Sequence, residues 1–417
     1  MEKQSSLVFY GNGDVSSNSK NIDNFFNSYL SKESIFKDKK SLSHGFVPDE
    51  ALHRDNEIMQ ISSIMAPSLR KYQPSNVFIY GSVGTGKTIC VKMVLKQLDE
   101  AAKKNSINLK TIYINCKMKK VADTEYRLLA QLLNEIGVEV PDTGLPTDVL
   151  YRRFFNEIDQ KEQSIIIVLD EIDTLIRKIG DDFLYNLTRI NSELQKAKLS
   201  FIGITNNLSF LSNLDARVKS SLGEEEILFH PYNAVQLKDI LKQRAEMAFN
   251  QGSVGQEIIS KCAALAAQEH GDARRALDLL RVAGELAERY GSTEIKEEHM
   301  DMAEKKIDQD RINETIKMMP SQTKAVLYSV MSMAEKNKGK VMTGDVFGYY
   351  KDVCVRNNLR FLTPRRVGDL LNELDMLSII NTQVISKGRY GRTREITLNI
   401  TEDTVENIKK NLLSIFG

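Results

Sequence analysis

Residues 81–88 read Gly81-Ser82-Val83-Gly84-Thr85-Gly86-Lys87-Thr88, a match to the pattern G-x-x-x-x-G-K-[ST]. Glycines in this pattern let backbone N–H groups turn inward around phosphate oxygens, and the helix that follows points its positive dipole end at the same place. We expect Lys87 to reach the β- and γ-phosphates and the Thr88 hydroxyl to bind Mg²⁺. A β-branched and aromatic run at 77–80 precedes the motif and a helical pattern follows it. Residues 81–88 are therefore predicted to bind a nucleotide.

A second motif lies where an apolar run at 165–169 continues directly into Asp170-Glu171-Ile172-Asp173. A buried strand that ends in acids places Asp170 at the carboxyl edge of a parallel sheet, beside the phosphate loop. Asp170 is predicted to hold Mg²⁺, directly or through water, and Glu171 to orient the attacking water. Acids at this point can also serve only to stabilise a helix N-terminus. The presence of both motifs in one segment favours the nucleotide site.

The elements around these motifs alternate between strands and helices. Strand-like runs separated by helical stretches indicate βαβ units, and thus an α/β fold with a parallel sheet covered by helices. The expected strands are residues 77–80, 111–115, 165–169, 200–204 and 227–229.

Beyond Pro231 the pattern changes twice. Four helical stretches between 234 and 308 predict a small all-α unit. From Pro320 onward, three helices and then two strands around a Gly-rich loop predict a winged helix, that is, a helix-turn-helix followed by a β-hairpin. The predicted division is a flexible Ser-, Asn- and Lys-rich tail at 1–45, an α/β domain at 46–230, a helical domain at 231–312 and a winged-helix domain at 313–417.

Composition limits the classes of partner. The 417 residues carry 57 Lys+Arg against 56 Asp+Glu, a net charge of +1, so any attraction to nucleic acid must be local. The four cysteines are far apart in sequence, which argues against a zinc site or a disulfide framework. No run of about 18 apolar residues could span a bilayer, so we expect a cytoplasmic protein with no membrane partner.

Positive charge is concentrated near the end of the chain. Residues 356–394 contain eight Lys and Arg and three acids, a local charge of +5. Thr363 can cap a helix that begins with Pro364, and the arginines that follow are placed as in a recognition helix of the major groove. A basic, Gly-flanked hairpin tip suits a DNA backbone or a minor groove. A protein-binding winged helix with a solvated basic face is the alternative. The predicted DNA-binding residues are Thr363, Arg365, Arg366, Lys387, Arg389, Tyr390 and Arg392.

Three polar residues remain ambiguous from their positions alone. Asn206 follows the strand at 200–204, within reach of the γ-phosphate, but asparagine also commonly caps helices and forms turns. Arg217 and Arg274 could each sense phosphate, yet an arginine at such a position can equally be solvated or paired with an acid.

Taken together, these motifs resemble the AAA+ ATPases, and within them the archaeal replication initiators related to eukaryotic origin-recognition and helicase-loading proteins. The resemblance covers roughly residues 46–417. Besides the two nucleotide motifs and Gly388-Arg389-Tyr390-Gly391-Arg392, it rests on Val47–Asp55, Leu214–Glu226, Pro231–Ala234 and Gly271–Leu280.

The resemblance implies roles for individual residues. Asn206 resembles the sensor 1 residue, Arg274 the sensor 2 arginine of the lid, and Arg217 the arginine finger that acts on a neighbouring subunit's nucleotide. Three further residues match positions that line the nucleotide site, and residues 121–150 resemble an insertion that contacts DNA in this family. Those three residues are Arg54, Tyr232 and Arg244.

The function implied is that of an ATP-dependent, origin-binding replication initiator with a slow, switch-like ATPase. Its cofactors would be ATP/ADP and Mg²⁺, and its partners double-stranded origin DNA, the replicative helicase and paralogous initiator subunits at the nucleoid. Nucleotide between base and lid would set their angle, and thereby the posture of the winged helix. A clamp-loader-like AAA+ protein and a nucleotide-bound DNA-binding regulator without loading activity are the alternatives.

Overall fold

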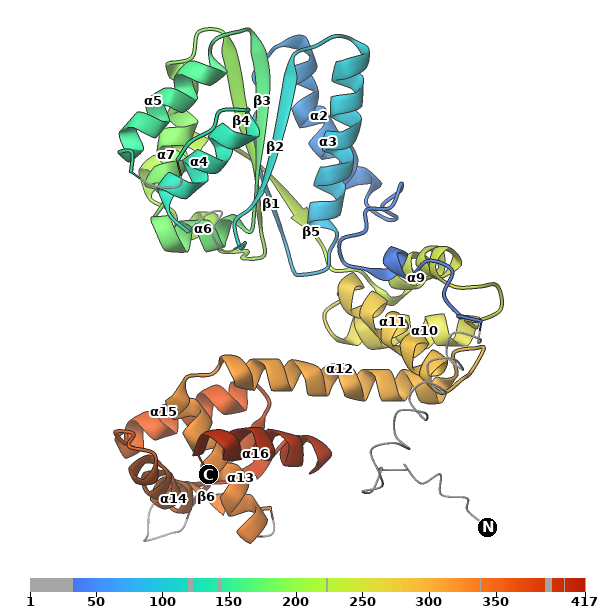
Figure 1. The fold of residues 1–417 in the computed structure, drawn as a ribbon, viewed down its shortest axis with the longest axis vertical. Coiled ribbons are helices and arrows are strands. Elements are labelled where there is room, and N and C mark those ends of the chain that lie inside the picture. Colours follow the sequence, from blue (N-terminus) through green and yellow to red (C-terminus); the bar gives the residue numbers. More distant parts are fainter. Residues whose placement is uncertain are drawn as a thin grey trace, which may run out of the picture. The chain divides into compact units, whose positions relative to one another are not determined.

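A computed structural model describes residues 33–118, 123–141, 144–222, 224–337, 339–386, 392–400 and 402–416. The chain divides into two compact units, Met1–Met300 and Asp301–Gly417 (Figure 1). None of the helices within the described residues is both long and apolar enough to cross a membrane.

The first unit is built around a five-stranded parallel sheet in the order β2-β3-β4-β1-β5. Each strand contains the run predicted for it, and most extend a residue or two further. The parallel sheet with helices on both faces is thus confirmed. The strands are β1 (Asn76–Gly81), β2 (Leu109–Asn115), β3 (Gln163–Asp170), β4 (Ala197–Thr205) and β5 (Glu224–Phe229).

Strand β3 illustrates why the sheet is covered on both faces. Ile165 and Ile167 belong to one buried cluster, whereas Ile166 and Val168 belong to another, and all four are at most 1% exposed. Successive strand side chains point to opposite faces, so a continuous apolar run fits only a strand with helices on both sides. Burial of each such side chain contributes about 1.5–3 kcal/mol to folding.

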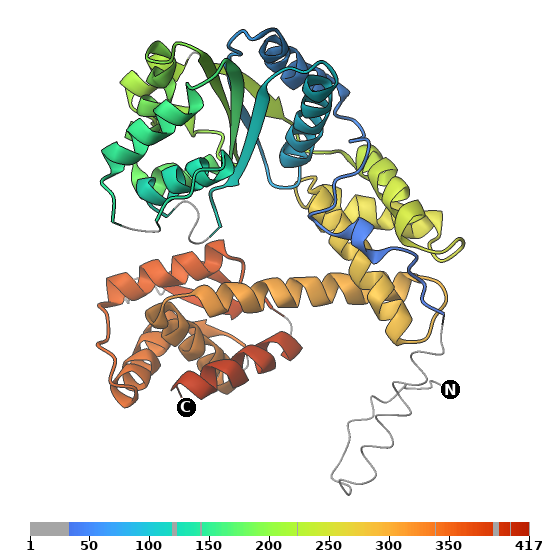
Figure 2. The same ribbon diagram turned by 45° about the horizontal axis from the view of Figure 1, so that its top comes forward.

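Helices α2 and α3 cover one face of the sheet, and α4, α5 and α7 cover the other, as both views show (Figures 1 and 2). Helix α6 begins directly after β3 ends, and helix α8 ends directly before β5 begins. The helices and 3₁₀ turns are α2 (Asp55–Met65), η2 (Ala66–Arg70), α3 (Lys87–Lys104), α4 (Glu125–Glu135), α5 (Thr147–Ile158), α6 (Ile172–Ile179), α7 (Asp182–Arg189), η3 (Ile190–Ser192), η4 (Leu211–Asn213) and α8 (Ala216–Leu222).

The same unit continues into a helical part made of α9 (Ala234–Ala248), α10 (Gln256–Gln268) and α11 (Ala273–Arg289). Asn233 and Gln236 form a reciprocal capping box that fixes the start of α9. Asp272 accepts hydrogen bonds from two backbone N–H groups at the start of α11. Helix α12 (Glu297–Met318) then leads from the first unit into the second.

Residues 33–45 differ from the flexible tail predicted from their composition. Phe36 stacks on Phe249 with ring centroids 4.8 Å apart, and the buried Leu42 lies in the 3₁₀ turn η1 (Lys39–Leu42). Lys37 donates a backbone hydrogen bond to Ala248 at the end of α9. A few apolar side chains in a polar segment suffice to order it when a neighbouring helical surface is available. The sequence does not reveal that surface.

The second unit is a helical domain with a three-stranded antiparallel sheet in the order β6-β8-β7. The predicted winged helix is confirmed. Tyr350 and Leu371 are fully buried in its core. Two elements were not predicted: the two-residue strand β6 and the last helix. The elements are α13 (Ser321–Lys336), β6 (Val341–Met342), α14 (Thr343–Arg356), α15 (Pro364–Met376), β7 (Ile380–Ser386), β8 (Arg392–Leu398) and α16 (Glu402–Phe416).

Candidate functional site

The phosphate-binding loop connects β1 to α3 at the carboxyl edge of the sheet. Gly84 and Gly86 both have left-handed backbone, with φ of 74° and 94°. A Cβ on Gly86 would lie 2.7 Å from the hydroxyl of Tyr232, and one on Gly84 would overlap the carboxylate of Asp272. Both glycines are therefore required by backbone conformation and by close approach. The loop leaves the first N–H groups of α3 facing a pocket, which suits a phosphate.

Lys87 is buried at the start of α3, and its ammonium group is fully hydrogen-bonded. Nζ donates to the carbonyl oxygens of Gly81 and Ser82 at 2.7 and 2.8 Å and to Oδ1 of Asn206 at 2.8 Å. Burial, reinforced by the positive charge of Arg274, lowers the pKa of Lys87 to about 8. A nearby phosphate would favour the charged form.

This pKa predicts how nucleotide affinity depends on pH. Binding needs the protonated ammonium, so affinity should be constant well below pH 8 and fall by up to about tenfold per pH unit above it. Isothermal titration with ADP between pH 7 and 9.5 measures the slope. In Lys87→Arg the cation stays charged, so its affinity should show no such fall. An equal fall in both proteins would contradict the assignment.

Asp170 lies at the end of β3 and is 5% exposed. Its Oδ2 accepts hydrogen bonds from the Thr88 hydroxyl at 2.9 Å and from the Tyr113 hydroxyl at 2.5 Å. A hydroxyl and a carboxylate side by side form the all-oxygen set that Mg²⁺ prefers. Within the described residues, no group of three His, Cys, Asp or Glu side chains could hold a metal alone. The residues therefore fit a magnesium ion held jointly with nucleotide phosphates.

Glu171 follows in left-handed backbone, with φ of 57°. This conformation is unfavourable for a residue with a side chain and is found where a site requires it. Oε1 of Glu171 accepts a hydrogen bond from Nδ2 of Asn206 at 3.1 Å. Asn206 thus joins Lys87 to Glu171 through the two ends of one amide.

Arg54 and Tyr232 form one wall beneath the loop. The Arg54 guanidinium lies 4.0 Å from the Tyr232 ring centroid, and its Nε donates to the carbonyl of Thr85 at 2.9 Å. It also donates to the carbonyl of His230 and pairs with Glu57. Arg54 is only 4% exposed. We therefore infer that it shapes the loop from below instead of touching a nucleotide.

Arg244 projects from α9 into the same pocket. Its guanidinium lies 4.6 Å from the ring centroid of Phe46, and one nitrogen donates to the carbonyl of Ser41 at 3.2 Å. Nε is buried and has no hydrogen-bond partner among the described residues. Arg274, at the start of α11, lines the pocket too. The pocket is thus closed by the loop, by residues 43–52 and by the helical lid.

Arg217 does not reach this pocket. It lies at the start of α8 with 72% of its side chain exposed, and it pairs with Asp215 at 3.1 Å. At the start of α11, by contrast, the backbone N–H of Ala273 donates to the carbonyl of Gly84 in the phosphate-binding loop at 3.2 Å. The Arg217 side chain thus faces solvent instead of the pocket.

Three residues that the sequence reasoning missed support the site. Tyr113 comes from β2, next to β3, and its hydroxyl contacts Asp170. Thr205 and Asp173 form a hydrogen bond beside Asn206 at 3.0 Å. Asp173 was visible as the last acid of the motif, and Thr205 as the residue before Asn206. Tyr113 had no motif to mark it.

Four of the seven predicted DNA-binding residues lie within the part of the chain that the structure describes. Thr363 caps α15 by accepting the backbone N–H of Arg366, and Pro364 occupies the first helical turn. Arg365 is exposed, and the exposed Arg366 pairs with Asp369 at 3.5 Å. Arg392 begins β8. The remaining three, Lys387, Arg389 and Tyr390, lie outside the described residues.

A P-loop after β1, two acids at the end of β3, a helical lid and a winged helix define an AAA+ ATPase with a nucleic-acid-binding type of domain. Three family matches agree: an AAA domain at residues 70–211, a Cdc6 AAA+ ATPase-type lid domain at 238–305 and a CDC6 C-terminal winged helix domain at 314–408.

Known relatives narrow the class. The ORC1-type DNA replication protein of Thermococcus onnurineus and ORC1-type DNA replication protein 1 of Methanosarcina mazei are each 51% identical over 394 residues, 94% of both chains. A solved structure of the Aeropyrum pernix ORC1 protein in complex with DNA is 43% identical, covers 91% of this chain and 98% of its own, and has a TM-score of 0.77. The chain belongs to the family of ORC1-type DNA replication proteins.

Proposed function

We propose that this chain is an ATP-dependent replication initiator that binds duplex origin DNA and helps recruit or load the replicative helicase. The observation that carries the proposal is the combination in one chain of a P-loop pocket lined by Asp170 and Glu171 and a winged helix whose α15 carries Arg365 and Arg366 in its first turn. The name and DNA complex of the Aeropyrum pernix relative support the DNA part. We place the protein in the cytoplasm at the nucleoid and expect paralogous initiator subunits as partners.

The nucleotide site is proposed to hold ATP or ADP with Mg²⁺, which supplies charge neutralisation of the phosphates when bound. Lys87 would bind the β- and γ-phosphates, while Thr88 and Asp170 would hold the metal. Glu171 would orient the attacking water, and Asn206 and Arg274 would contact the γ-phosphate from the base and the lid. The loop residues 81–86 would wrap the phosphates with backbone N–H groups, and Arg244 would close the pocket opposite them.

The DNA site is proposed to combine the start of α15 with the basic hairpin tip. Thr363, Arg365 and Arg366 would enter the major groove, while the tip residues Lys387, Arg389, Tyr390 and Arg392 would contact backbone or minor groove. Residues 121–150 would add a second contact. We propose that the α/β domain begins at residue 46, the helical domain at residue 231 and the winged-helix domain at residue 313.

Footprinting on genomic DNA of the source organism, with ATP, with ADP and without nucleotide, tests the function. Protection of discrete sites that changes with nucleotide is the expected result. Uniform protection without preferred sites would argue against an origin-binding role. Sites that are insensitive both to nucleotide and to Lys87→Ala would favour a DNA-binding regulator in which the nucleotide is structural.

Because Arg217 faces solvent, we predict that it completes the site of a neighbouring copy. Arg217→Ala should bind ATP normally but reduce hydrolysis by assembled protein about 100-fold or more, as for arginine fingers in general. Mixing Arg217→Ala with Glu171→Gln should restore part of the activity, since some interfaces then combine an intact finger with an intact acid. Phosphate release measured over a range of protein concentrations checks this. Fast hydrolysis by the isolated monomer would contradict it.

A further inference from the structure

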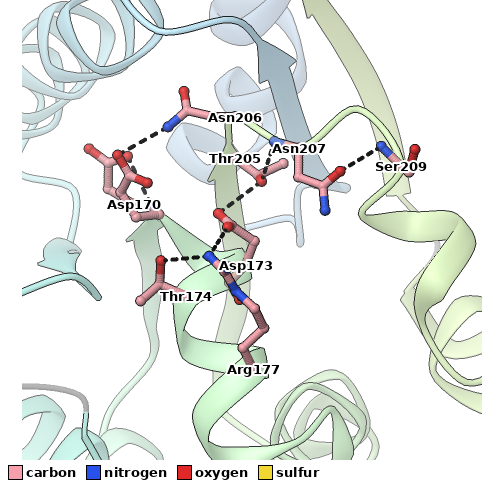
Figure 3. Close-up of polar contacts among 9 residues, drawn as sticks. Asp170, Asp173, Thr174, Arg177, Thr205, Asn206, Asn207 and Ser209 are labelled. Carbon is pink, nitrogen blue, oxygen red and sulfur yellow. Dashed lines mark hydrogen bonds and ion pairs between the residues drawn. The ribbon is translucent and has the colours of Figure 1, made fainter. Parts of the chain in front are cut away.

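The position of Asn206 depends on a turn whose own support lies outside the nucleotide pocket. Asn206 is the first residue after β4, and its amide bonds both Lys87 and Glu171. A side chain that contacts a γ-phosphate needs a precisely positioned backbone, because a misplacement of about 1 Å can reduce the reaction rate about 100-fold. Figure 3 shows the residues behind this turn.

Thr205, the last residue of β4, is 1% exposed, and both hydrogen-bonding functions of its hydroxyl are used. Oγ1 donates to Oδ1 of Asp173 at 3.0 Å and accepts the backbone N–H of Asn207 at 3.0 Å. The side chain of Asn207 then accepts the N–H of Ser209 at 3.0 Å (Figure 3). One hydroxyl therefore ties the backbone on the far side of Asn206 to a carboxylate on another element.

Asp173 lies in the first turn of α6, two residues after Glu171, and 13% of its side chain is exposed. Its Oδ2 accepts from the Arg177 guanidinium at 2.8 Å, and Arg177 also donates to the Asp173 carbonyl at 3.2 Å. Since the Arg177 side chain is 73% exposed, this pair adds little stability. It does orient the carboxylate toward Thr205.

The loops that carry Asn206 and Glu171 are thus joined twice. The direct bond between these two side chains occupies Oε1 of Glu171, whose carboxylate the proposed function assigns to the attacking water. The bond from Thr205 to Asp173 does not involve Glu171 and can persist throughout. We propose that Thr205 and Asp173 are positioning residues that keep Asn206 in place for γ-phosphate contact, an inference that rests on the proposed ATPase function.

The test removes one hydroxyl with little change of shape. Thr205→Val should lower kcat for ATP hydrolysis about tenfold or more, while KM and the Kd for ATP stay within about threefold. Thr205→Ser keeps the hydroxyl and should recover most of the rate. Asp173→Asn still offers an oxygen to Thr205 but weakens the pairing with Arg177, so its rate should fall between those of Thr205→Ser and Thr205→Val.

A matched control exists in the same sheet. Thr111 on β2 also donates its hydroxyl to a carboxylate, that of Asp99, at 2.8 Å. Thr111 lies toward the amino-terminal end of its strand, away from the carboxyl edge that carries the nucleotide site. Thr111→Val loses the same kind of hydrogen bond and should leave kcat unchanged. Thermal unfolding of both valine variants reports any general loss of stability.

Equal kcat in Thr205→Val and the wild type would overturn the proposal, as would equal losses in Thr205→Val and Thr111→Val. If the wild type itself hydrolyses no ATP, the hydrolytic part of the proposed function fails and structures decide the inference. Crystals of the wild type and Thr205→Val with Mg²⁺ and a non-hydrolysable ATP analogue should then differ in the position of the Asn206 amide. An unmoved amide would refute the positioning role.

Discussion

Glu171→Gln is expected to reduce ATP hydrolysis about 100-fold or more while leaving ATP affinity nearly unchanged. The glutamine keeps the shape of the side chain, and its carbonyl oxygen can still accept the Asn206 hydrogen bond now seen at 3.1 Å. It lacks the negative charge that polarises an attacking water and accepts its proton, a contribution of about 100- to 10,000-fold. The substitution therefore preserves the hydrogen bond with Asn206 and removes only the negative charge of the side chain.

Single-turnover phosphate release measures the rate of hydrolysis, and nucleotide titration measures the affinity for ATP. Glu162→Gln is a suitable control, because Glu162 is an exposed acid whose partner is Lys71. Its rate should match that of the wild type. Retention of more than half of the wild-type rate by Glu171→Gln would show that another group orients the water.

The second large effect concerns DNA. Deletion of residues 320–417 is expected to weaken duplex binding about 100-fold or more, because it removes the recognition helix and the basic hairpin tip together. In the full chain, Arg365→Ala combined with Arg366→Ala should weaken binding about 30-fold or more if both arginines contact bases, at about 1–3 kcal/mol each, and less if they contact only phosphate.

Fluorescence anisotropy with a duplex at several salt concentrations separates these contributions. Loss of phosphate contacts should make the dependence of log affinity on log salt less steep by about 0.9 per contact. Arg70→Ala, at an exposed arginine of the first unit, serves as the control and should change neither affinity nor slope. Unchanged binding after the deletion would favour a loader that holds DNA elsewhere, and binding insensitive to salt would contradict the electrostatic argument.

Local sequence carried most of the nucleotide site. The loop 81–88 and the two acids Asp170 and Glu171 are separated by more than 80 residues, yet the loop lies at the end of β1 and the acids at the end of β3. Parallel strands bring their carboxyl ends to one edge, so the meeting of these groups follows from topology alone. The structure places Thr88 2.9 Å from Asp170, as this reasoning requires.

Contacts between distant segments were less accessible to sequence reasoning. Tyr113 reaches Asp170 only because β2 pairs with β3 in one register. Residues 33–45 adopt a defined structure because they contact α9. Strand β6 has only two residues and forms only because it pairs with β8. Neither a short polar segment nor a two-residue strand has a periodicity that predicts it.

The order of the amino acids was sufficient to identify the main chemical groups: the P-loop glycines, Lys87, the two acids at the end of β3 and a locally basic end. These depend on residue type and on short-range spacing, which backbone geometry converts directly into a site. Tertiary structure alone decided that Arg217 faces solvent, that Arg54 packs beneath the loop, and that Thr205 bonds Asp173 behind Asn206. Those outcomes depend on which side chains meet across separate elements, and that is settled by packing of the whole unit.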